Sequence, residues 1–229
     1  MSNQLYIVHY PYKPEYAEGA SGVVRNLDYS RIDKCPKCGN YVSGALWVPP
    51  RQVILTSRKV PDFLYHYGAE TFFLLSKNAL EKIQQAGLRG ITFAEKIDKV
   101  GFQRKSKKEF PIPEYYYFKL QRSRITIDHQ KSHIKYGESY GGKKESCPLC
   151  RQVPGTYDWF FSLSFNMDAY EGYDIFQTYE MCSRVFLSQR FVDFYKESGL
   201  TNLHYLPVEE YNRERSEYML YGKKPSGME

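Results

Sequence analysis

The chain has 229 residues, of which 42% are hydrophobic and 25% charged, and its formal net charge is +6. This length and composition support a buried core in one domain or in two small ones. No apolar run approaches the roughly 18 residues of a membrane-spanning helix, so we expect no membrane contact. The N-terminal segment MSNQLYIVHY lacks the basic and apolar regions of a secretory signal, which favours a cytoplasmic protein.

The tyrosine and cysteine contents narrow the class further. The 22 tyrosines are typical of a β-rich fold, of a recognition surface, or of both. The five cysteines are an odd number in a chain without a signal, which favours reduced thiols or a metal site over a disulfide framework.

The first part of the chain predicts a strand, a knuckle and a capped helix. QLYIVHY (4–10) is the expected opening strand, CPKCGN (35–40) is a Cys-x-x-Cys knuckle, and strand segments surround Trp47. In SKNALEKIQQAGLRGITF (76–93), Ser76 is placed to cap a helix and Gly87 to end it in the left-handed conformation. The predicted apolar helix positions are Ala79, Leu80 and Ile83, and those of the strand that follows are Ile91 and Phe93.

The second part predicts the same succession of elements. YYYFKL (115–120) is an expected strand, DHQKSHIKYGESYGGKKES (128–146) a polar loop, and CPLC (147–150) a second knuckle. In SQRFVDFYKESGLTNLHY (188–205), Ser188 and Gly199 take the two capping positions. The predicted apolar helix positions are Phe191, Val192 and Tyr195, and Leu203 and Tyr205 belong to the strand that follows.

The two parts align without a gap at an offset of 112 residues. The rare residues coincide: Trp47 falls on Trp159, Asp62 on Asp174, Tyr67 on Tyr179, Leu75-Ser76 on Leu187-Ser188, and Gly87-Leu88 on Gly199-Leu200. We therefore predict an α+β fold made of tandem duplicated halves in a pseudo-twofold arrangement. The predicted boundaries are a first half over 1–100, a connection over 101–114, a second half over 115–215 and a flexible tail over 216–229.

The duplication predicts one shared metal site. Two halves packed about a pseudo-twofold axis would bring Cys35 and Cys38 to Cys147 and Cys150, which completes a Cys₄ set typical of structural zinc. Iron in a rubredoxin-like site uses the same ligands. Arg151 stands where the first knuckle has Gly39, so the second turn is expected to be less regular. The fifth cysteine, Cys182, is expected to be a buried small hydrophobic residue.

At these residues the chain resembles a known family. The two CPxC motifs, together with LSKNALEKIQQAGLRGI and FLSQRFVDFYKESGLTNLHYLPV, are similar to the double-CXXCG motif family, whose members include immunity proteins of bacterial contact-dependent toxin systems. The resemblance covers about residues 4–210. It implies a cytosolic protein that binds and neutralises a cognate toxin domain, with metal ligation by the same four cysteines.

The motifs argue against an enzyme. The chain has no Walker-type loop, no G-x-S-x-G and no His-Glu-x-x-His. His129 and His133 have helical i, i+4 spacing, but their polar surroundings predict a solvated loop. His9, His66 and His204 stand among aromatic residues, as histidines of the core or its rim do.

Two classes of binding protein remain. A nucleic-acid binder would use the zinc ribbon, with RKSKK (104–108) and Lys143-Lys144 at phosphates and tyrosines stacked on bases. We rank it second, because basic and acidic residues are dispersed and nearly equal in number. An interaction protein would use a tyrosine-rich surface. Its candidate contact segments are PEYYYF (113–118) and NMDAYEGYDIFQTYE (166–180), whose four carboxylates could mimic phosphates, although 166–180 also reads as buried strands.

Overall fold

The computed structural model describes residues 4–9, 15–19, 26–66, 71–103, 110–136, 147–150 and 157–211. These residues form a mixed α+β fold with two α-helices, two short 3-10 helices and several small sheets. The helices are α1 (Lys77–Gln85) and α2 (Gln189–Ser198), and the 3-10 helices are η1 (Tyr29–Arg31) and η3 (Val208–Glu210). The predicted α+β class is therefore confirmed.

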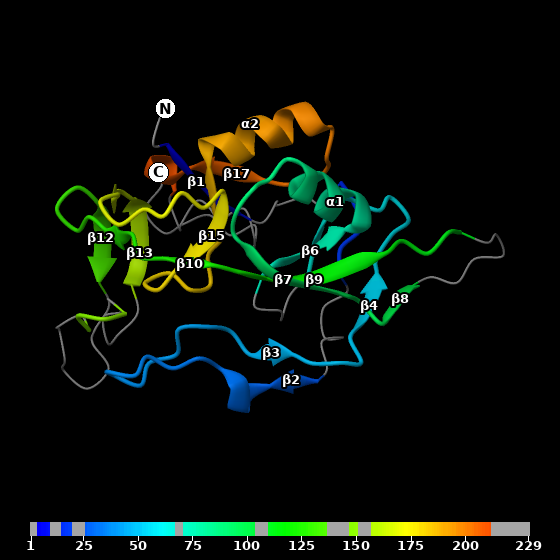
Figure 1. Cartoon of the computed structure of the whole chain (residues 1–229), viewed down its shortest axis with the longest axis horizontal. Coiled ribbons are helices and arrows are strands. Elements are labelled where there is room, and N and C mark those ends of the chain that lie inside the picture. Colours follow the sequence, from blue (N-terminus) through cyan, green and yellow to red (C-terminus); the bar gives the residue numbers. More distant parts are fainter. Residues whose placement is uncertain are drawn as a thin grey trace, which may run out of the picture.

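The strands fall mainly into two sheets, which lie side by side beneath the helices in Figure 1. The four-stranded sheet has the order β5-β6-β9-β7 and the five-stranded sheet the order β10-β15-β16-β1-β17. Their strands are β1 (Leu5–Val8), β5 (Phe63–Tyr65), β6 (Phe73–Ser76), β7 (Ile91–Lys96), β9 (Tyr115–Leu120), β10 (Arg122–Ser123), β15 (Ile175–Thr178), β16 (Phe186–Ser188) and β17 (Tyr205–Pro207).

Four two-stranded sheets flank these two. They pair β2 with β3, β4 with β8, β11 with β14, and β12 with β13. Their strands are β2 (Leu27–Asp28), β3 (Leu46–Trp47), β4 (Gln52–Leu55), β8 (Lys99–Phe102), β11 (Thr126–Ile127), β12 (His133–Tyr136), β13 (Tyr157–Ser162) and β14 (Phe165–Asn166).

Each large sheet contains one strand that lies outside the stretch of chain that supplies its other strands. β9 lies between β6 and β7, and it pairs with both in antiparallel orientation. In the same way β1 lies between β16 and β17. β1 is remote in sequence from both of its partners, whereas β9 follows β7 along the chain after a single connection.

Both helices begin and end as their sequences predict. The hydroxyl oxygen of Ser76 accepts a hydrogen bond from the amide of Ala79, and that of Ser188 accepts one from the amide of Phe191. Such caps typically stabilise a helix by about 1 kcal/mol. Gly87 and Gly199 follow the helices with φ of 62° and 69°, a left-handed conformation that glycine adopts without steric cost.

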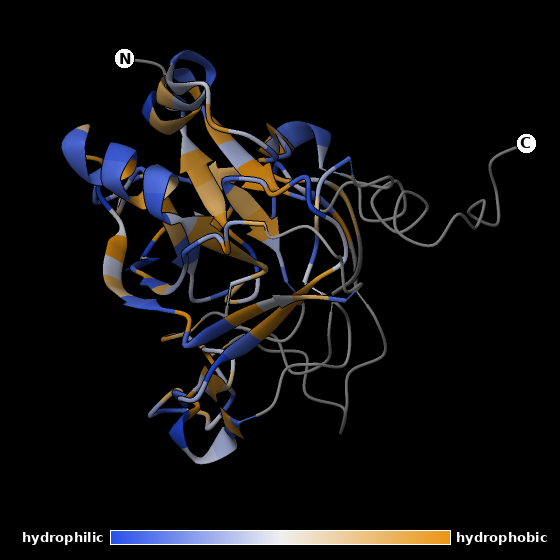
Figure 2. Ribbon diagram, turned by 90° about the vertical axis from the view of Figure 1, so that its right-hand side faces the viewer, coloured by the Kyte–Doolittle hydropathy of each residue, from blue (hydrophilic) through white to orange (hydrophobic). Residues whose placement is uncertain are grey.

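A shared core lies under the two helices. Its buried residues come from both large sheets and from the inner faces of α1 and α2, and they include the predicted Ala79, Leu80, Ile83, Phe191 and Val192. Tyr195 packs against this core while remaining half-buried. Figure 2 shows the hydrophobic colour concentrated on the strands and the hydrophilic colour on the outer turns of the helices.

The two hairpins that precede the helices have matching pairings. In one, Phe63 pairs with Leu75; in the other, Ile175 pairs with Leu187, each residue 112 positions further along the chain. The two capping serines are also held in matching ways. The Ser76 hydroxyl donates a hydrogen bond to Asp62, and the Ser188 hydroxyl donates one to Asp174.

Asp62 and Asp174 also bind across to the opposite half. Asp174 Oδ2 accepts a hydrogen bond of 2.8 Å from the amide of Arg89, and Asp62 Oδ2 accepts one of 3.1 Å from the amide of Thr201. The backbone repeats the exchange: the amide of Phe63 donates to the Thr201 carbonyl, and the amide of Ile175 donates to that of Arg89. Each carboxylate thus ties its own hairpin to the loop after the other helix.

The structure corrects the first predicted contact segment. PEYYYF (113–118) was expected to offer a contact surface, but Tyr115, Tyr117 and Phe118 are almost completely buried. They belong to β9, which has a strand on each side and core on both faces. Tyrosine density therefore reflects a central strand here, and the prediction was wrong.

The second segment, 166–180, divides into a buried and an exposed part. Ile175–Thr178 form the buried strand β15, so the alternative interpretation as a strand is confirmed there. Asp174 and Glu180 are buried and engaged within the protein, which excludes them as phosphate mimics. Asp168 is exposed and Glu171 half-buried. Several predictions concern residues outside the described ranges: the tail over 216–229, Arg151, Tyr67, the basic run 104–108 and Lys143-Lys144.

Asp174 provides a test of the cross-connection. We expect Asp174→Ala to lower the free energy of unfolding by about 3 kcal/mol, because it leaves the Arg89 amide and the Ser188 hydroxyl without their charged acceptor. The exposed Asp168→Ala is the matched control and should change stability by less than about 0.5 kcal/mol. Urea unfolding followed by circular dichroism measures both, and equal effects would contradict the assigned role.

Candidate metal centre

The first knuckle is a tight turn held by its own backbone. The amide of Cys35 donates to the Asn40 carbonyl at 2.8 Å, and the amide of Gly39 donates to the Cys35 carbonyl at 2.9 Å. Gly39 has φ of 76°, so a residue with a side chain would be strained there. A bridge between Lys34 and Tyr41 closes the turn at its base.

The second knuckle meets the first face to face. The four cysteine sulfurs lie within 4.8 Å of one another, with Cys35 and Cys147 3.8 Å apart and Cys38 and Cys150 3.5 Å apart. These separations rule out disulfides, whose sulfurs bond at about 2.05 Å. A tetrahedral site with metal–sulfur bonds of about 2.3 Å has edges of about 3.8 Å, so this cluster could hold a metal ion.

Backbone amides favour the thiolate form in each knuckle. The amide of Cys150, followed by that of Leu149, lowers the pKa of Cys147 to about 6, although burial acts to raise it. Burial also acts to raise the pKa of Cys35, but the amides of Cys38 and Lys37 outweigh it and the net pKa is lowered. Both shifts favour the thiolate, which is the form of cysteine that binds a metal.

Cys38 shows the opposite net shift. The amide of Asn40 lowers its pKa, but burial and the thiols of Cys35 and Cys147 outweigh this and raise it. Four thiolates this close would repel one another unless a cation lay between them. The cluster has the donor set and the electrostatic need for a cation. Ligation by these four residues stays a prediction.

Cys182 does not join the cluster and is not in the core. It is half-buried in the turn after β15, with its sulfur 4.0 Å from the carbonyl oxygen of Tyr41. The expectation of a buried hydrophobic residue was therefore wrong. The turn passes along the surface beside the first knuckle, which leaves one side of the thiol accessible.

No histidine in the described part of the chain belongs to a cluster of possible metal ligands. Burial lowers the pKa of His66 to about 4, and its ring stacks on Trp47 with centroids 4.9 Å apart. His9 and His204 pack against each other at the rim. These placements confirm the predicted core and rim roles. His129 lies in a turn and its Nε2 is 3.1 Å from Glu180 Oε1, while His133 begins β12.

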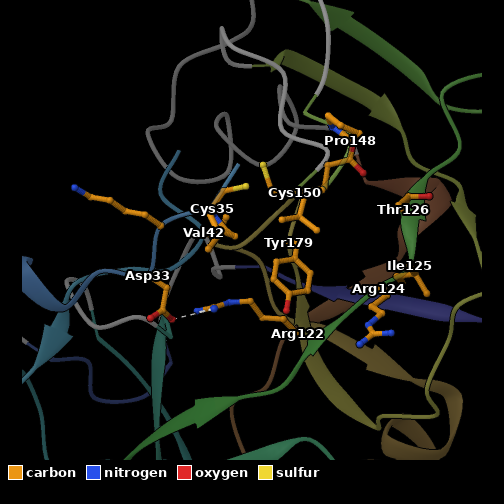
Figure 3. A pocket seen from close by; sticks show the side chains of 14 residues that line it. Asp33, Cys35, Val42, Arg122, Arg124, Ile125, Thr126, Pro148, Cys150 and Tyr179 are labelled. Atoms are coloured by element: carbon orange, nitrogen blue, oxygen red, sulfur yellow. Dashed lines mark hydrogen bonds and ion pairs between the residues drawn. The ribbon is translucent and has the colours of Figure 1, made fainter. Parts of the chain in front are cut away.

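A pocket of about 640 Å³ opens beside the metal centre. Its walls include both knuckles, the segment Arg122–Thr126 and the end of β15 at Tyr179 and Glu180. Figure 3 shows Arg122 pointing to Asp33 with Tyr179 between Arg122 and Cys150. Arg122 and Arg124 were not predicted as site residues. An arginine in or beside a short strand gives no local sign in the sequence that it faces a pocket.

Neither helix in the described part of the chain has the length and apolar character that crossing a bilayer requires. The geometry defines a mixed α+β protein with a candidate four-thiolate metal centre and a pocket beside it. Residues 69–210, more than half of the chain, match the immunity protein family Imm11. The chain belongs to this family, which is one of immunity proteins and not of enzymes.

The family match confirms the resemblance to immunity proteins over a shorter segment than expected. It includes Cys147 and Cys150 but begins after Cys35 and Cys38. None of the curated proteins matches the chain.

The cluster can be tested by removing one sulfur. We expect Cys147→Ser to lose its bound metal and to lower the free energy of unfolding by several kcal/mol, because metal binding energy becomes folding energy. The control Cys182→Ser removes the cysteine outside the cluster and should keep both metal and stability. Metal analysis of the purified proteins and thermal unfolding make the comparison. Full metal content with an unchanged Tm in Cys147→Ser would contradict a shared site.

Proposed function

We propose that this protein neutralises a cognate toxin domain by binding it in the cytoplasm, without catalysis. The observation that carries the proposal is the membership of the immunity protein family. The described residues add support, because their histidines are engaged in packing or in an ion pair and their clustered cysteines resemble a structural centre. A rigid scaffold with tyrosine and arginine at its surface suits protein recognition.

We propose zinc as the metal, held by Cys35, Cys38, Cys147 and Cys150 in a structural role. Four thiolates fill a tetrahedral ion completely, which leaves no position for a substrate or a water molecule. Iron shares this preference for four thiolates, and its absorption in the visible range would distinguish it from zinc. In either case the ion clips together two turns that are 112 residues apart in the sequence.

The same offset underlies a proposed tandem duplication. The matching hairpin pairings, the reciprocal bonds of Asp62 and Asp174, and the paired cysteines all support two halves related by a pseudo-twofold axis. We propose halves over 1–100 and 115–215, joined by 101–114. In this arrangement the halves exchange their opening strands, β1 and β9.

The immunity function can be tested with the intact chain in its native cell. A tagged protein should co-purify with a stoichiometric fragment of a larger secreted protein. Purified and expressed alone, that fragment should stop cell growth, and co-expression of this chain should restore it. Co-purification of RNA or DNA without such a fragment would favour the second candidate, a zinc-ribbon nucleic-acid binder.

The duplication predicts the behaviour of the separated halves. Residues 1–106 and 107–229 produced as two chains should each fail to fold alone, because each lacks the strand that completes its sheet and two of the four sulfurs. Produced together, they should associate into one metal-containing particle. Size-exclusion chromatography with metal analysis tests this, and independent folding of either fragment would contradict the exchange.

A further inference from the structure

The pocket beside the metal centre combines parts of the chain that are distant in sequence. Asp33 to Val42 come from the first knuckle, Arg122 to Thr126 from β10 and β11, and Pro148 to Cys150 from the second knuckle. Tyr179 and Glu180 complete it. Two of these walls, the knuckles, carry the clustered sulfurs, so the pocket lies directly beside the candidate metal centre.

The pocket has an apolar lining with an exposed apolar rim. Val42, Ile125 and Cys150 are buried within it. Leu149 and Tyr179 stand at its mouth with 55% and 38% of their surface exposed. They are among the few large apolar residues that the described surface exposes to this degree. Such residues beside a hollow are typical of a protein-binding site.

The acidic groups of the pocket are engaged within the protein. Asp33 pairs with Arg122 at 3.0 Å. Glu180 is buried and accepts a hydrogen bond from the Ile127 amide at 2.8 Å, and its other oxygen lies 3.1 Å from His129. These carboxylates therefore present little negative charge to a molecule that enters the pocket.

Two of the three basic residues that line the pocket, Arg124 and Lys34, are exposed, whereas Arg122 is mostly buried and paired with Asp33. Arg124 has 81% of its side chain exposed, and its nearest carboxylate, Glu171, is 4.0 Å away. An ion pair this open contributes at most about 1 kcal/mol, so a carboxylate from a partner can replace it. Lys34 is also exposed and lies over the ring of Tyr41. The mouth of the pocket is therefore positive around an apolar centre.

We propose that this pocket receives an acidic segment of the toxin domain. Carboxylates of that segment pair with Arg124 and with Lys34, and an apolar side chain between them packs against Tyr179 and Leu149. The inference rests on the proposed immunity function, and it names the surface and the chemistry through which that function acts. A nucleic acid is less suited, because the rim of the pocket is partly aliphatic and Leu149 offers no surface on which a base could stack.

The first measurement is a titration of the full, metal-loaded chain with a fluorescent acidic peptide, Glu-Asp-Phe-Asp-Glu. The control is a basic peptide of the same length, Lys-Lys-Phe-Lys-Lys. We expect the acidic peptide to bind and the basic peptide not to bind. Arg124→Glu should weaken acidic-peptide binding by about tenfold or more, because it reverses the charge at the mouth. Lys77→Glu makes the same charge change on the exposed start of α1 and should leave binding within about twofold.

Three results would overturn the proposal: no binding of the acidic peptide, equal binding of both peptides, or no effect of Arg124→Glu. Binding of a single-stranded oligonucleotide that Arg124→Glu abolishes would assign the pocket to nucleic acid instead.

A growth-protection assay with the captured toxin fragment tests the immunity function and the pocket assignment separately. If wild type and Lys77→Glu protect cells but Arg124→Glu does not, the pocket is the neutralising surface. If all three protect, the pocket assignment fails while the immunity function stands. If wild type itself fails to protect, the proposed function is wrong, and the peptide titration alone decides the chemistry of the pocket.

Discussion

The structure depends on the insertion of β1 and β9 into sheets whose other main strands come from the opposite part of the chain. An antiparallel strand with a neighbour on each side pairs its backbone groups along both edges, whereas its removal leaves two unpaired edges. Tyr115, Tyr117 and Phe118 of β9 then become core residues, and Ile7 does so in β1. The five-stranded sheet needs β1, whose residue Leu5 pairs with Ser188, so its formation closes a long loop of the chain.

The candidate metal centre is a second place where the first and second parts of the chain meet. Around the helices, burial of apolar side chains and the bonds of Asp62 and Asp174 hold the halves together. The knuckles have little apolar surface of their own: the core around them consists of the cysteines and Val42. In the proposed site, four ligands on one ion would supply the cohesion that packing does not, as in other small metal-bound modules.

Local sequence patterns were sufficient for the elements they encode. The caps at Ser76 and Ser188, the left-handed glycines and the strand Tyr115–Leu120 follow from capping chemistry and periodicity, which act within a few residues. The burial of PEYYYF could not be predicted, because it depends on which strands lie to either side of β9. Cys182 was misjudged for the same reason, since its exposure is set by the path of a surface turn.

The pocket shows why a recognition surface is harder to predict than a fold. Lys34, Arg124, Leu149 and Tyr179 lie on four separate segments, and only Leu149 belongs to a recognisable motif, the second knuckle. Only the meeting of the knuckles brings them together. A surface assembled from short loops on a fixed support can change its residues without disturbing the cysteines or the exchanged strands. A protein that must match a changing partner benefits from this separation, because stability and specificity then rest on different residues.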